Sequence, residues 1–575
     1  MKNENFLWSA FKAGLLGGAI TIFICFIGMV EIFSKRDVIE KTITLGQFML
    51  LATGAVAGFV ASQRTSKLLG ENKPVPMLLS GLLAGLLTGS ILALLVVIGS
   101  KVNLRAVFLN ASPALYSLLT NKKGTGNLWV LPTMGAISGI LGATFLLLPD
   151  TVRRPISRGL VSVIFMALFS GLFRVVMINQ GPGMSKAAKY LFGQTGLTLE
   201  GTLIFFFGVV LITMLWNYQG KTIQSSIARL PKSGQVSLRV VTIALIAYVA
   251  LGLPQVAGPF IAQVIVTVAL FILMGLGLNI TLGFAGLLDL GFVAFYAVGA
   301  YTVGLLTSYG PFGLQHVSFW VAVPIAVLVS MAFGAVLGLP VLGVRGDYLA
   351  IATLGFGEIV RLLAGSDFLA PYFGGPQGII GIQKPCLGVL ADFIKVDVPR
   401  VCNGIELGKP QDIYYVAVTA ALLIAFVAWR LRESRLGRAW MAIREDEDVA
   451  EALGINLIQT KLLAYILGAA MAGLGGAIFA TLIGSIFASS MQLLVSINVV
   501  SLIIVGGMGS IPGVIVGAIA LIGLPELLRE VSEFRYLIYG LTLIVMMLAK
   551  PEGLWPSQAT LRELHHSEVE AEAKT

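Results

Sequence analysis

The stretch RGDYLAIATLGFGEIVR, residues 345–361, combines an apolar sequence suited to a lipid bilayer with two ionisable side chains. Glu358 and Arg361 stand three positions apart within it. Ionisable side chains are expensive at membrane depth and are kept where they face a partner, a pore or a substrate. At this spacing the two lie on one face of a helix and can neutralise each other. We favour an ion pair that holds the helix in register, and contact with a substrate is the open alternative.

The rest of the chain has the composition of a polytopic membrane protein. Of 575 residues, 57% are hydrophobic and 12% are charged, against about 25% charged in a soluble domain. A helix needs about 20 apolar residues to span a bilayer. We expect an all-α, polytopic helical membrane protein with about 16 apolar segments, at 8–30, 44–61, 76–99, 128–148, 157–178, 200–216, 239–253, 257–280, 282–307, 316–340, 347–364, 412–430, 461–486, 494–507, 511–528 and 534–549.

Glycines within these segments predict both close packing and helix breaks. Gly81, Gly85 and Gly89 repeat at a spacing that lets helix backbones approach closely. The short segment 494–507 runs into GGMGSIPG, which indicates a broken or re-entrant helix. Irregular backbone at membrane depth must be covered by protein or line a water-filled cavity.

The net charge of +10 does not indicate nucleic-acid binding, because the basic residues lie between apolar segments. This distribution is typical of residues that orient a protein in the membrane. Basic residues flanking the loop after position 430 place that loop in the cytoplasm. Counting helices back from there places loop 365–411 outside. The basic residues are Arg430, Arg432, Arg435, Arg438, Arg444 and Lys461.

Cysteine and histidine usage argues against a metal or haem site. Cys25 lies in the first apolar segment, and Cys386 and Cys402 lie in the longest polar loop without CxxC spacing. The latter two can form a disulfide in an oxidising compartment, with two free thiols as the alternative. His316 stands at a predicted helix entrance and the other histidines in the carboxyl-terminal tail, so paired axial haem ligands are missing and a membrane enzyme is not expected. GKT at 220–222 lacks the first glycine of a phosphate loop, since position 215 is Leu215.

Four further motifs share an order with 345–361: GLNITLGFAGLLDLGFVAFYAVGAY at 277–301, GGPQGI at 374–379, SRLGRAWMAIREDEDVAEALGIN at 434–456 and IIVGGMGSIPG at 503–513. Together they resemble the LivM-type permease subunit of branched-chain amino-acid ABC transporters. The resemblance covers about 240–555 and predicts a permease domain at 236–556. Composition predicts the other two parts, a hydrophobic extension with a basic linker at 1–235 and a polar cytoplasmic tail at 557–575. The basic stretch that forms the linker is residues 217–239.

The resemblance also implies partners and a location. The chain would form half of a translocation pathway in the bacterial plasma membrane, beside a homologous LivH-like permease. Two ATPase subunits would bind the ATP, so that this chain needs no cofactor of its own. A periplasmic or extracellular binding protein would deliver branched-chain or other neutral amino acids. The alternatives are a LivM-type permease for urea, or an ion- or proton-coupled transporter that uses Asp289 or Glu358 as its relay.

The segment 434–456 resembles the cytoplasmic coupling loop of such permeases, with Glu451–Gly454 similar to the EAA-type sequence. Acids dominate from 444 to 451 and bases from 430 to 438, which is consistent with charge-guided docking on a partner. An ordinary solvated loop is the alternative. The predicted ATPase-coupling residues are Arg444, Glu445, Asp446, Glu451, Ala452, Leu453, Gly454 and Ile455.

Glycine-rich turns and Asp289 are the remaining candidates. Half-helix amino termini at such turns can face a substrate carboxylate, although a weakly selective path behind a binding protein is the alternative we favour. Asp289 either lies beside the path or accepts a backbone N–H after the helix break, which we also favour. The predicted path or helix-break residues are Gly283, Gly286, Asp289, Glu358, Arg361, Gly374, Gly375, Gly378, Gly506, Gly507 and Gly509.

Overall fold

The computed structural model describes residues 6–69, 73–120, 127–228, 232–314, 317–341, 343, 347–387, 405–527 and 534–556. Its chain divides into two compact units, Met1–Ala244 and Leu245–Thr575. Helices dominate both units, and the only strands among the described residues are short antiparallel pairs. The predicted tail at 557–575 lies outside the described residues, as do Cys402 and His316.

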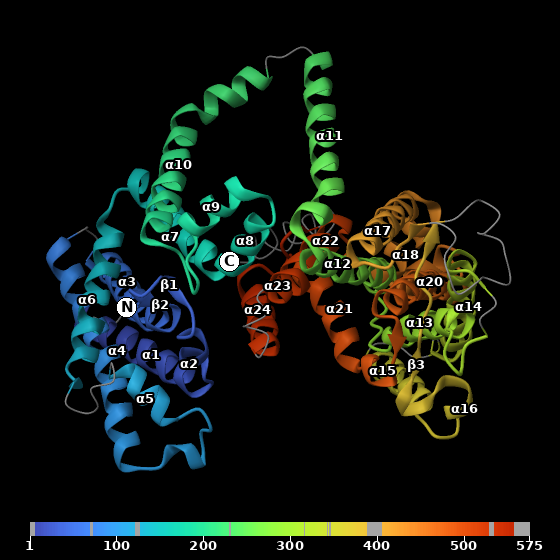
Figure 1. Cartoon of the computed structure of the whole chain (residues 1–575), viewed down its shortest axis with the longest axis horizontal. Coiled ribbons are helices and arrows are strands. Elements are labelled where there is room, and N and C mark those ends of the chain that lie inside the picture. Colours follow the sequence, from blue (N-terminus) through green and yellow to red (C-terminus); the bar gives the residue numbers. More distant parts are fainter. Residues whose placement is uncertain are drawn as a thin grey trace. The chain divides into compact units, whose positions relative to one another are not determined.

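The first unit is built around four closely packed helices, α1 (Phe6–Phe26), α3 (Leu45–Leu69), α4 (Pro74–Lys101) and α6 (Val130–Leu147) (Figure 1). A Cβ added at Gly85 would lie 2.1 Å from the Gly135 backbone oxygen, and one at Gly89 would lie 2.3 Å from the Leu131 oxygen. The predicted close packing at these glycines is confirmed. The remaining elements are α2 (Met29–Phe33), β1 (Asp37–Ile39), β2 (Ile43–Thr44), η1 (Leu104–Ala106), α5 (Pro113–Leu119), α7 (Asp150–Leu168), α8 (Ser170–Ile178), α9 (Pro182–Leu191) and α10 (Leu199–Ala228).

Helix α11 (Lys232–Ala257) follows α10 and carries the chain into the second unit. The expected basic linker at 217–239 is therefore helical over much of its length. The reason is local, because Gly220 is the only glycine or proline from 217 to 228, and a single glycine weakens a helix without ending it.

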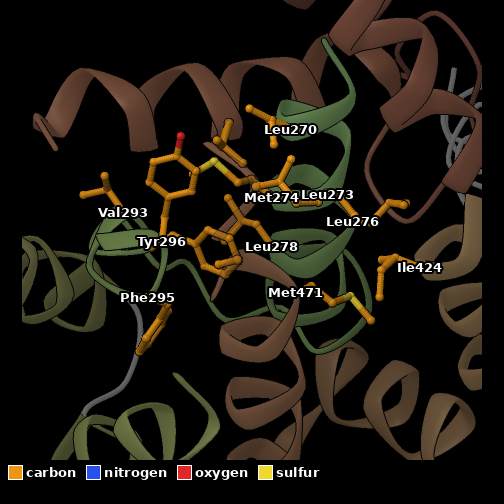
Figure 2. Close-up of a cluster of buried hydrophobic side chains, with 14 of the residues drawn as sticks. Leu270, Leu273, Met274, Leu276, Leu278, Val293, Phe295, Tyr296, Ile424 and Met471 are labelled. Carbon is orange, nitrogen blue, oxygen red and sulfur yellow. The ribbon is translucent and has the colours of Figure 1, made fainter. Parts of the chain in front are cut away.

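The second unit packs α12 (Pro259–Leu278), α13 (Val293–Thr307), α14 (Phe319–Val341), α17 (Pro410–Glu433) and α20 (Leu457–Ile483) around one apolar core. Figure 2 shows part of this core, where Tyr296 of α13 lies beside Met274 of α12. Phe295 of α13 and Met471 of α20 belong to the same core. The other helices are α15 (Asp347–Ala364), α16 (Ala370–Phe373), α18 (Arg435–Glu445), α19 (Glu447–Ala452), α21 (Leu493–Gly506), α22 (Ile511–Ala518), α23 (Leu524–Leu527) and α24 (Arg535–Ala549).

Short irregular elements connect these helices. Single turns of 3₁₀- or π-helix occur at η3 (Asn279–Phe284), η4 (Gly375–Gln377), η6 (Ala488–Ser490) and η7 (Ile519–Gly523). Strand β3 (Ile379–Ile380) pairs with β6 (Ser485–Ile486), and β4 (Cys386–Leu387) pairs with β5 (Ile405–Glu406), both antiparallel. The β3–β6 pair fixes the turn at 374–378 against the end of α20.

Ten of the described helices are long and apolar enough to cross a membrane, or eleven if α7 and α8, bent by 66° at their break, form one span. Each predicted apolar segment contains helix, but Val293–Thr307, Ile511–Leu527 and Tyr539–Leu548 are shorter apolar helices. At 282–307 and 494–528 the helices are shorter than the apolar sequence that contains them, because glycine breaks divide that sequence into separate helices. The chain is a polytopic helical membrane protein.

Candidate functional site

Two of the predicted glycine breaks meet in the interior of the second unit. Helix α12 passes into the π-helical turn η3, where the buried Asn279 Oδ1 accepts a hydrogen bond from Gly509 N at 2.9 Å. A Cβ added at Gly283 would lie 2.8 Å from Gly509 N. Glycine is therefore needed here for the close approach of two backbones. We call residues 279–291 and 506–510 the helix-break junction.

The second break has the form that the sequence predicts. Helix α21 ends at Gly506 and α22 begins at Ile511, where Ser510 Oγ caps the new helix by accepting from Gly513 N at 3.1 Å. Gly507 has φ 119° and Gly509 has φ 75°, conformations that L side chains rarely adopt. The glycine-rich sequence thus permits the chain to turn between two apolar helices that pack on each other.

Asp289 lies in the loop between η3 and α13, and it is only 1% exposed. Its Oδ1 accepts a hydrogen bond from Gly291 N at 2.9 Å. The next residue, Leu290, donates its N–H to Thr353 Oγ1 of α15 at 3.1 Å. A Cβ added at Gly291 would lie 2.0 Å from the backbone oxygen of Thr353, so the loop and α15 are in close backbone contact. The carboxylate is thus a backbone acceptor ahead of α13, and its contact with a substrate stays a prediction.

Glu358 and Arg361 form the ion pair expected within α15. Arg361 Nε lies 2.9 Å from Glu358 Oε2 and 3.0 Å from Oε1. Their side chains are 41% and 30% exposed, respectively. Gly357, the neighbouring position, instead faces Gly291 across the contact with the loop. The pair therefore lies on the side of α15 that the second unit leaves partly uncovered.

The predicted coupling segment, residues 434–456 and called the coupling segment below, contacts neighbouring helices on its inner side. Trp440 is fully buried, and its Nε1 donates to Thr460 O at 2.8 Å. Glu447 of α19 lies 2.6 Å from the ammonium of Lys461 in α20. Arg444 Nη1 donates to Gly283 O, in η3, at 2.7 Å. The segment is thus joined both to α20 and to the helix-break junction.

The outer side of the coupling segment is open. Leu453 is 75% exposed and Val449 is 55% exposed, and Glu451 and Ala452 are exposed beside them. Gly454, with φ 86° and no atom within 4 Å of an added Cβ, ends α19 by donating its N–H to Glu451 O at 2.9 Å. Val449 and Leu453 thus form an apolar pair on the uncovered side of α19.

Of the other predicted coupling residues, Asp446 acts as the amino-terminal cap of α19. Its Oδ1 accepts from Asp448 N at 2.9 Å and from Val449 N at 3.0 Å. Glu445 is exposed, and Ile455 is partly buried and donates its N–H to Ala450 O at 3.1 Å. These contacts hold the shape of α19 rather than contribute to its open surface.

The third glycine turn lies away from the helix-break junction. Gly374, Gly375 and Gly378 all have positive φ, and a Cβ added at Gly378 would lie 2.0 Å from Ile486 O. Beside this turn, Lys384 Nζ donates to the backbone oxygens of Thr481 and, at 3.0 Å, of Leu482, where α20 ends. Burial lowers the pKa of Lys384, and the charge of Glu406 opposes that shift.

The cysteine prediction falls partly outside the described residues. Cys386 is disulfide-bonded, and Cys25 is buried and free. Cys402, the expected partner, has no described position. The pairing of Cys386 with Cys402 therefore stays a prediction.

Sequence reasoning missed five residues that hold the site together. Trp440 and Glu447 were not singled out within the coupling segment, and Lys461 was used only for orientation. The position of Lys461 at the start of an apolar segment was a signal for a buried ion pair. Asn279 and Thr353 carried no such signal, because a polar side chain in a membrane helix often bonds within its own helix.

The candidate spans and the glycine breaks between them make this chain a polytopic membrane protein, and its family is one of transport permeases rather than enzymes. The family described as branched-chain amino acid transport system, permease component, matches residues 260–549, and the chain belongs to this family. The resemblance inferred from the five motifs is thus confirmed.

Individual relatives agree with this assignment. The chain is 40% identical over 313 residues to the high-affinity branched-chain amino acid transport system permease protein LivM of Salmonella typhimurium, covering 53% of this chain and 72% of the relative. It is 40% identical over 323 residues to LivM of Escherichia coli, covering 54% and 74%. The permease protein LivH of Escherichia coli is 29% identical over 147 residues, covering 25% and 46%. No solved structure matches the chain.

Proposed function

We propose that this chain is one of two transmembrane subunits of an ATP-driven importer of branched-chain amino acids in a bacterial plasma membrane. The second unit would form half of the translocation pathway. A homologous LivH-like permease would supply the other half, a binding protein outside the membrane would deliver the amino acid, and two ATPase subunits would bind ATP. The names of the LivM and LivH relatives support the substrate class and the kind of second subunit.

The observation that carries this proposal is the two-sided coupling segment. Its open side presents Val449 and Leu453 to a partner, while its inner side contacts η3 through Arg444 and α20 through Glu447. A partner that moves α19 would therefore move both the helix-break junction and a long membrane helix. A solvated connector needs neither the exposed apolar pair nor the inner contacts.

The exposed side of α15 supports the position of the pathway. Tyr348 and Ile351 are 75% and 66% exposed, and an added Cβ at Gly355 meets no atom within 4 Å. The Glu358–Arg361 pair lies on the same helix. A mixed apolar and charged surface of this kind is costly against lipid, so we place it against the second permease and the path between the two.

The proposal is tested with the purified transporter in liposomes, by measuring amino-acid uptake and ATP hydrolysis stimulated by the loaded binding protein. Leu453→Ala removes most of the larger exposed apolar side chain of α19, and Glu451→Lys reverses a charge beside it. Both are expected to reduce stimulated hydrolysis at least fivefold, and the loss from Glu451→Lys should depend on salt because exposed charges are screened over about 10 Å at 0.1 M.

Glu433→Lys is the matched control for charge, because Glu433 is also exposed but lies at the end of α17. Gly454→Val should uncouple the complex, whereas Gly454→Asn should retain function, since asparagine tolerates the left-handed conformation. Wild-type stimulation and uptake in both Leu453→Ala and Gly454→Val would refute the assignment of this segment as the coupling element.

A further inference from the structure

An apolar groove of about 760 Å³ lies between α3, α6 and α7 of the first unit. We call it the lateral groove. Ser138 supplies the only polar side chain among the described residues that line it, and its hydroxyl donates to Gly135 O of its own helix at 2.9 Å. The volume falls within the range of about 300–1,000 Å³ that is usual for ligand sites. The walls therefore suit an apolar occupant that forms no hydrogen bond there.

The groove exists because α7 packs away from α3 and α6. Those two helices meet through their backbones, since a Cβ added at Gly142 would lie 2.0 Å from Ala55 O. Helix α7 packs on α10 instead, and a Cβ added at Gly159 would lie 2.9 Å from the Val210 side chain of that helix. An empty gap of this kind loses the dispersion contacts of the atoms around it, so an occupant of matching shape would stabilise the unit.

The lateral groove is closed at one end and is about as long as one leaflet of a bilayer. At the closed end Phe48 packs against a buried apolar cluster that includes Leu45 of α3 and Val163 of α7. Along α6 the lining runs from Met134 to Phe145, about 16 Å at a rise of about 1.5 Å per residue. Half of a hydrocarbon core about 30 Å thick is about 15 Å. One acyl chain that enters beside Phe145 therefore fits this length.

The opposite end of the groove is strongly basic. Arg153 lies seven positions before Leu160, on the groove face of α7, and Lys67 lies eight positions after Phe59, at the edge of the same stripe of α3. Arg153 pairs with Asp150, and their side chains are 31% and 61% accessible. Within 61–69 and 150–160 the one acid is Asp150, and the bases are Arg64, Lys67, Arg153, Arg154 and Arg158.

This basic end lies on the predicted cytoplasmic side. Helices α7 and α10 run antiparallel, because Ser162 Oγ approaches Phe205 O at 3.4 Å while Gly159 faces Val210. Helix α10 therefore ends at the basic end of the groove and carries the first part of the basic stretch 217–239, which predicts the cytoplasm. The cytoplasmic leaflet carries anionic lipids, and basic pockets between membrane helices on this side bind their headgroups.

We propose that the lateral groove binds one acyl chain of an anionic phospholipid from the cytoplasmic leaflet. The acyl chain lies along α6 between Met134 and Phe145, and it joins α7 to the two helices from which α7 is otherwise separated. Arg153 and Lys67 hold the lipid phosphate, with Asp150 as the competing acceptor for Arg153. The site belongs to the first unit, which the family match at 260–549 does not cover, and lipid binding there does not depend on the proposed transport function.

Native mass spectrometry of the full chain in detergent measures this binding, with dioleoylphosphatidylglycerol as the anionic probe and dioleoylphosphatidylcholine as the zwitterionic one. At equal concentration we expect at least fivefold more phosphatidylglycerol to be retained. Ala52→Trp on α3 and Leu160→Trp on α7 place an indole in the groove and should each reduce its retention at least fivefold. Ala19→Trp is the matched control, because Ala19 is exposed on α1 and does not line the groove. Wild-type retention in either groove variant would overturn the proposal.

A double substitution tests the phosphate site. Arg153→Gln combined with Lys67→Gln should lower the retention of phosphatidylglycerol to that of phosphatidylcholine, because only the anionic headgroup gains from these charges. Lys101→Gln combined with Arg105→Gln is the matched control, since both residues are exposed and lie at the end of α4 and in η1. An unchanged lipid preference in the first double variant, or an equal loss in both, rules out Arg153 and Lys67 as the phosphate site.

A phosphatidylglycerol with a photoreactive diazirine in its acyl chain locates the site in liposomes. The label should concentrate on peptides 48–59, 134–145 and 160–164 of the wild-type chain, a result that needs no substitution and so decides even if the tryptophan variants fail to insert. Equal labelling of α10, where Phe207 and Leu211 are 60% and 59% exposed, would indicate ordinary surrounding lipid and overturn the proposal. Label that disappears when a second permease subunit assembles would assign the groove to a protein helix instead.

Discussion

The ion pair between Glu447 and Lys461 predicts an unequal response to removing either charge. The Lys461 side chain is 6% exposed, whereas that of Glu447 is 29% exposed. Removing one partner of a buried pair costs about 3–5 kcal/mol when the remaining charge stays buried. For exposed pairs the corresponding value is about 0.2–1 kcal/mol. Glu447→Gln leaves the buried ammonium alone, so we expect a loss of about 3 kcal/mol, against about 1 kcal/mol for Lys461→Met.

The difference of about 2 kcal/mol corresponds to about a 30-fold difference in the opening equilibrium of α19 and the start of α20. Backbone hydrogen exchange of residues 446–465 in the purified protein measures that equilibrium directly. Asp150→Asn is the control, because the Asp150–Arg153 pair is more exposed, with side chains 61% and 31% accessible, and should change little. If Lys461→Met opens this region as much as Glu447→Gln does, burial of the ammonium does not set the energy of the pair.

Three other substitutions test the packing of the site and of the first unit. Trp440→Phe deletes the donor to Thr460 O and should destabilise the start of α20 by about 1–3 kcal/mol, seen as faster amide exchange there. Asn279→Val removes the acceptor of Gly509 N in the interior and should lower the thermal unfolding temperature while exposing that amide to exchange. Gly85→Val places a Cβ 2.1 Å from a backbone oxygen of α6, so α4 and α6 should separate and a cysteine cross-link between them should form more slowly; unchanged cross-linking would contradict this packing.

Local sequence was sufficient to predict where helices break, because the breaks depend on residues with special backbone conformations. Gly507 and Gly509 adopt positive φ at a turn that glycine alone permits readily. The ion pair of Glu358 with Arg361 was predictable for a similar reason, since both residues lie on one helix and their spacing fixes their geometry. The helical, polytopic architecture followed from the same local information.

Contacts between distant segments were not predictable in this way. Nothing in the spacing of Asn279 and Gly509 indicates that they form a hydrogen bond. The hydrogen bond from Trp440 to Thr460 likewise depends on how α18 packs against α20. Each predicted apolar segment contains helix, although α13 and the helix Ile511–Leu527 are shorter than the ten candidate spans among the described residues.

The bond between Asn279 and Gly509 can form only late in the synthesis of the chain. The two residues are 230 positions apart, and a ribosome adds about 5–20 residues per second. Asn279 is therefore made roughly 10–50 s before its partner exists. During that interval its amide oxygen needs a temporary donor from water or the insertion machinery, since an unpaired polar group in lipid is expensive. The earlier helices of the second unit can therefore complete their packing only after α21 and α22 have been synthesised.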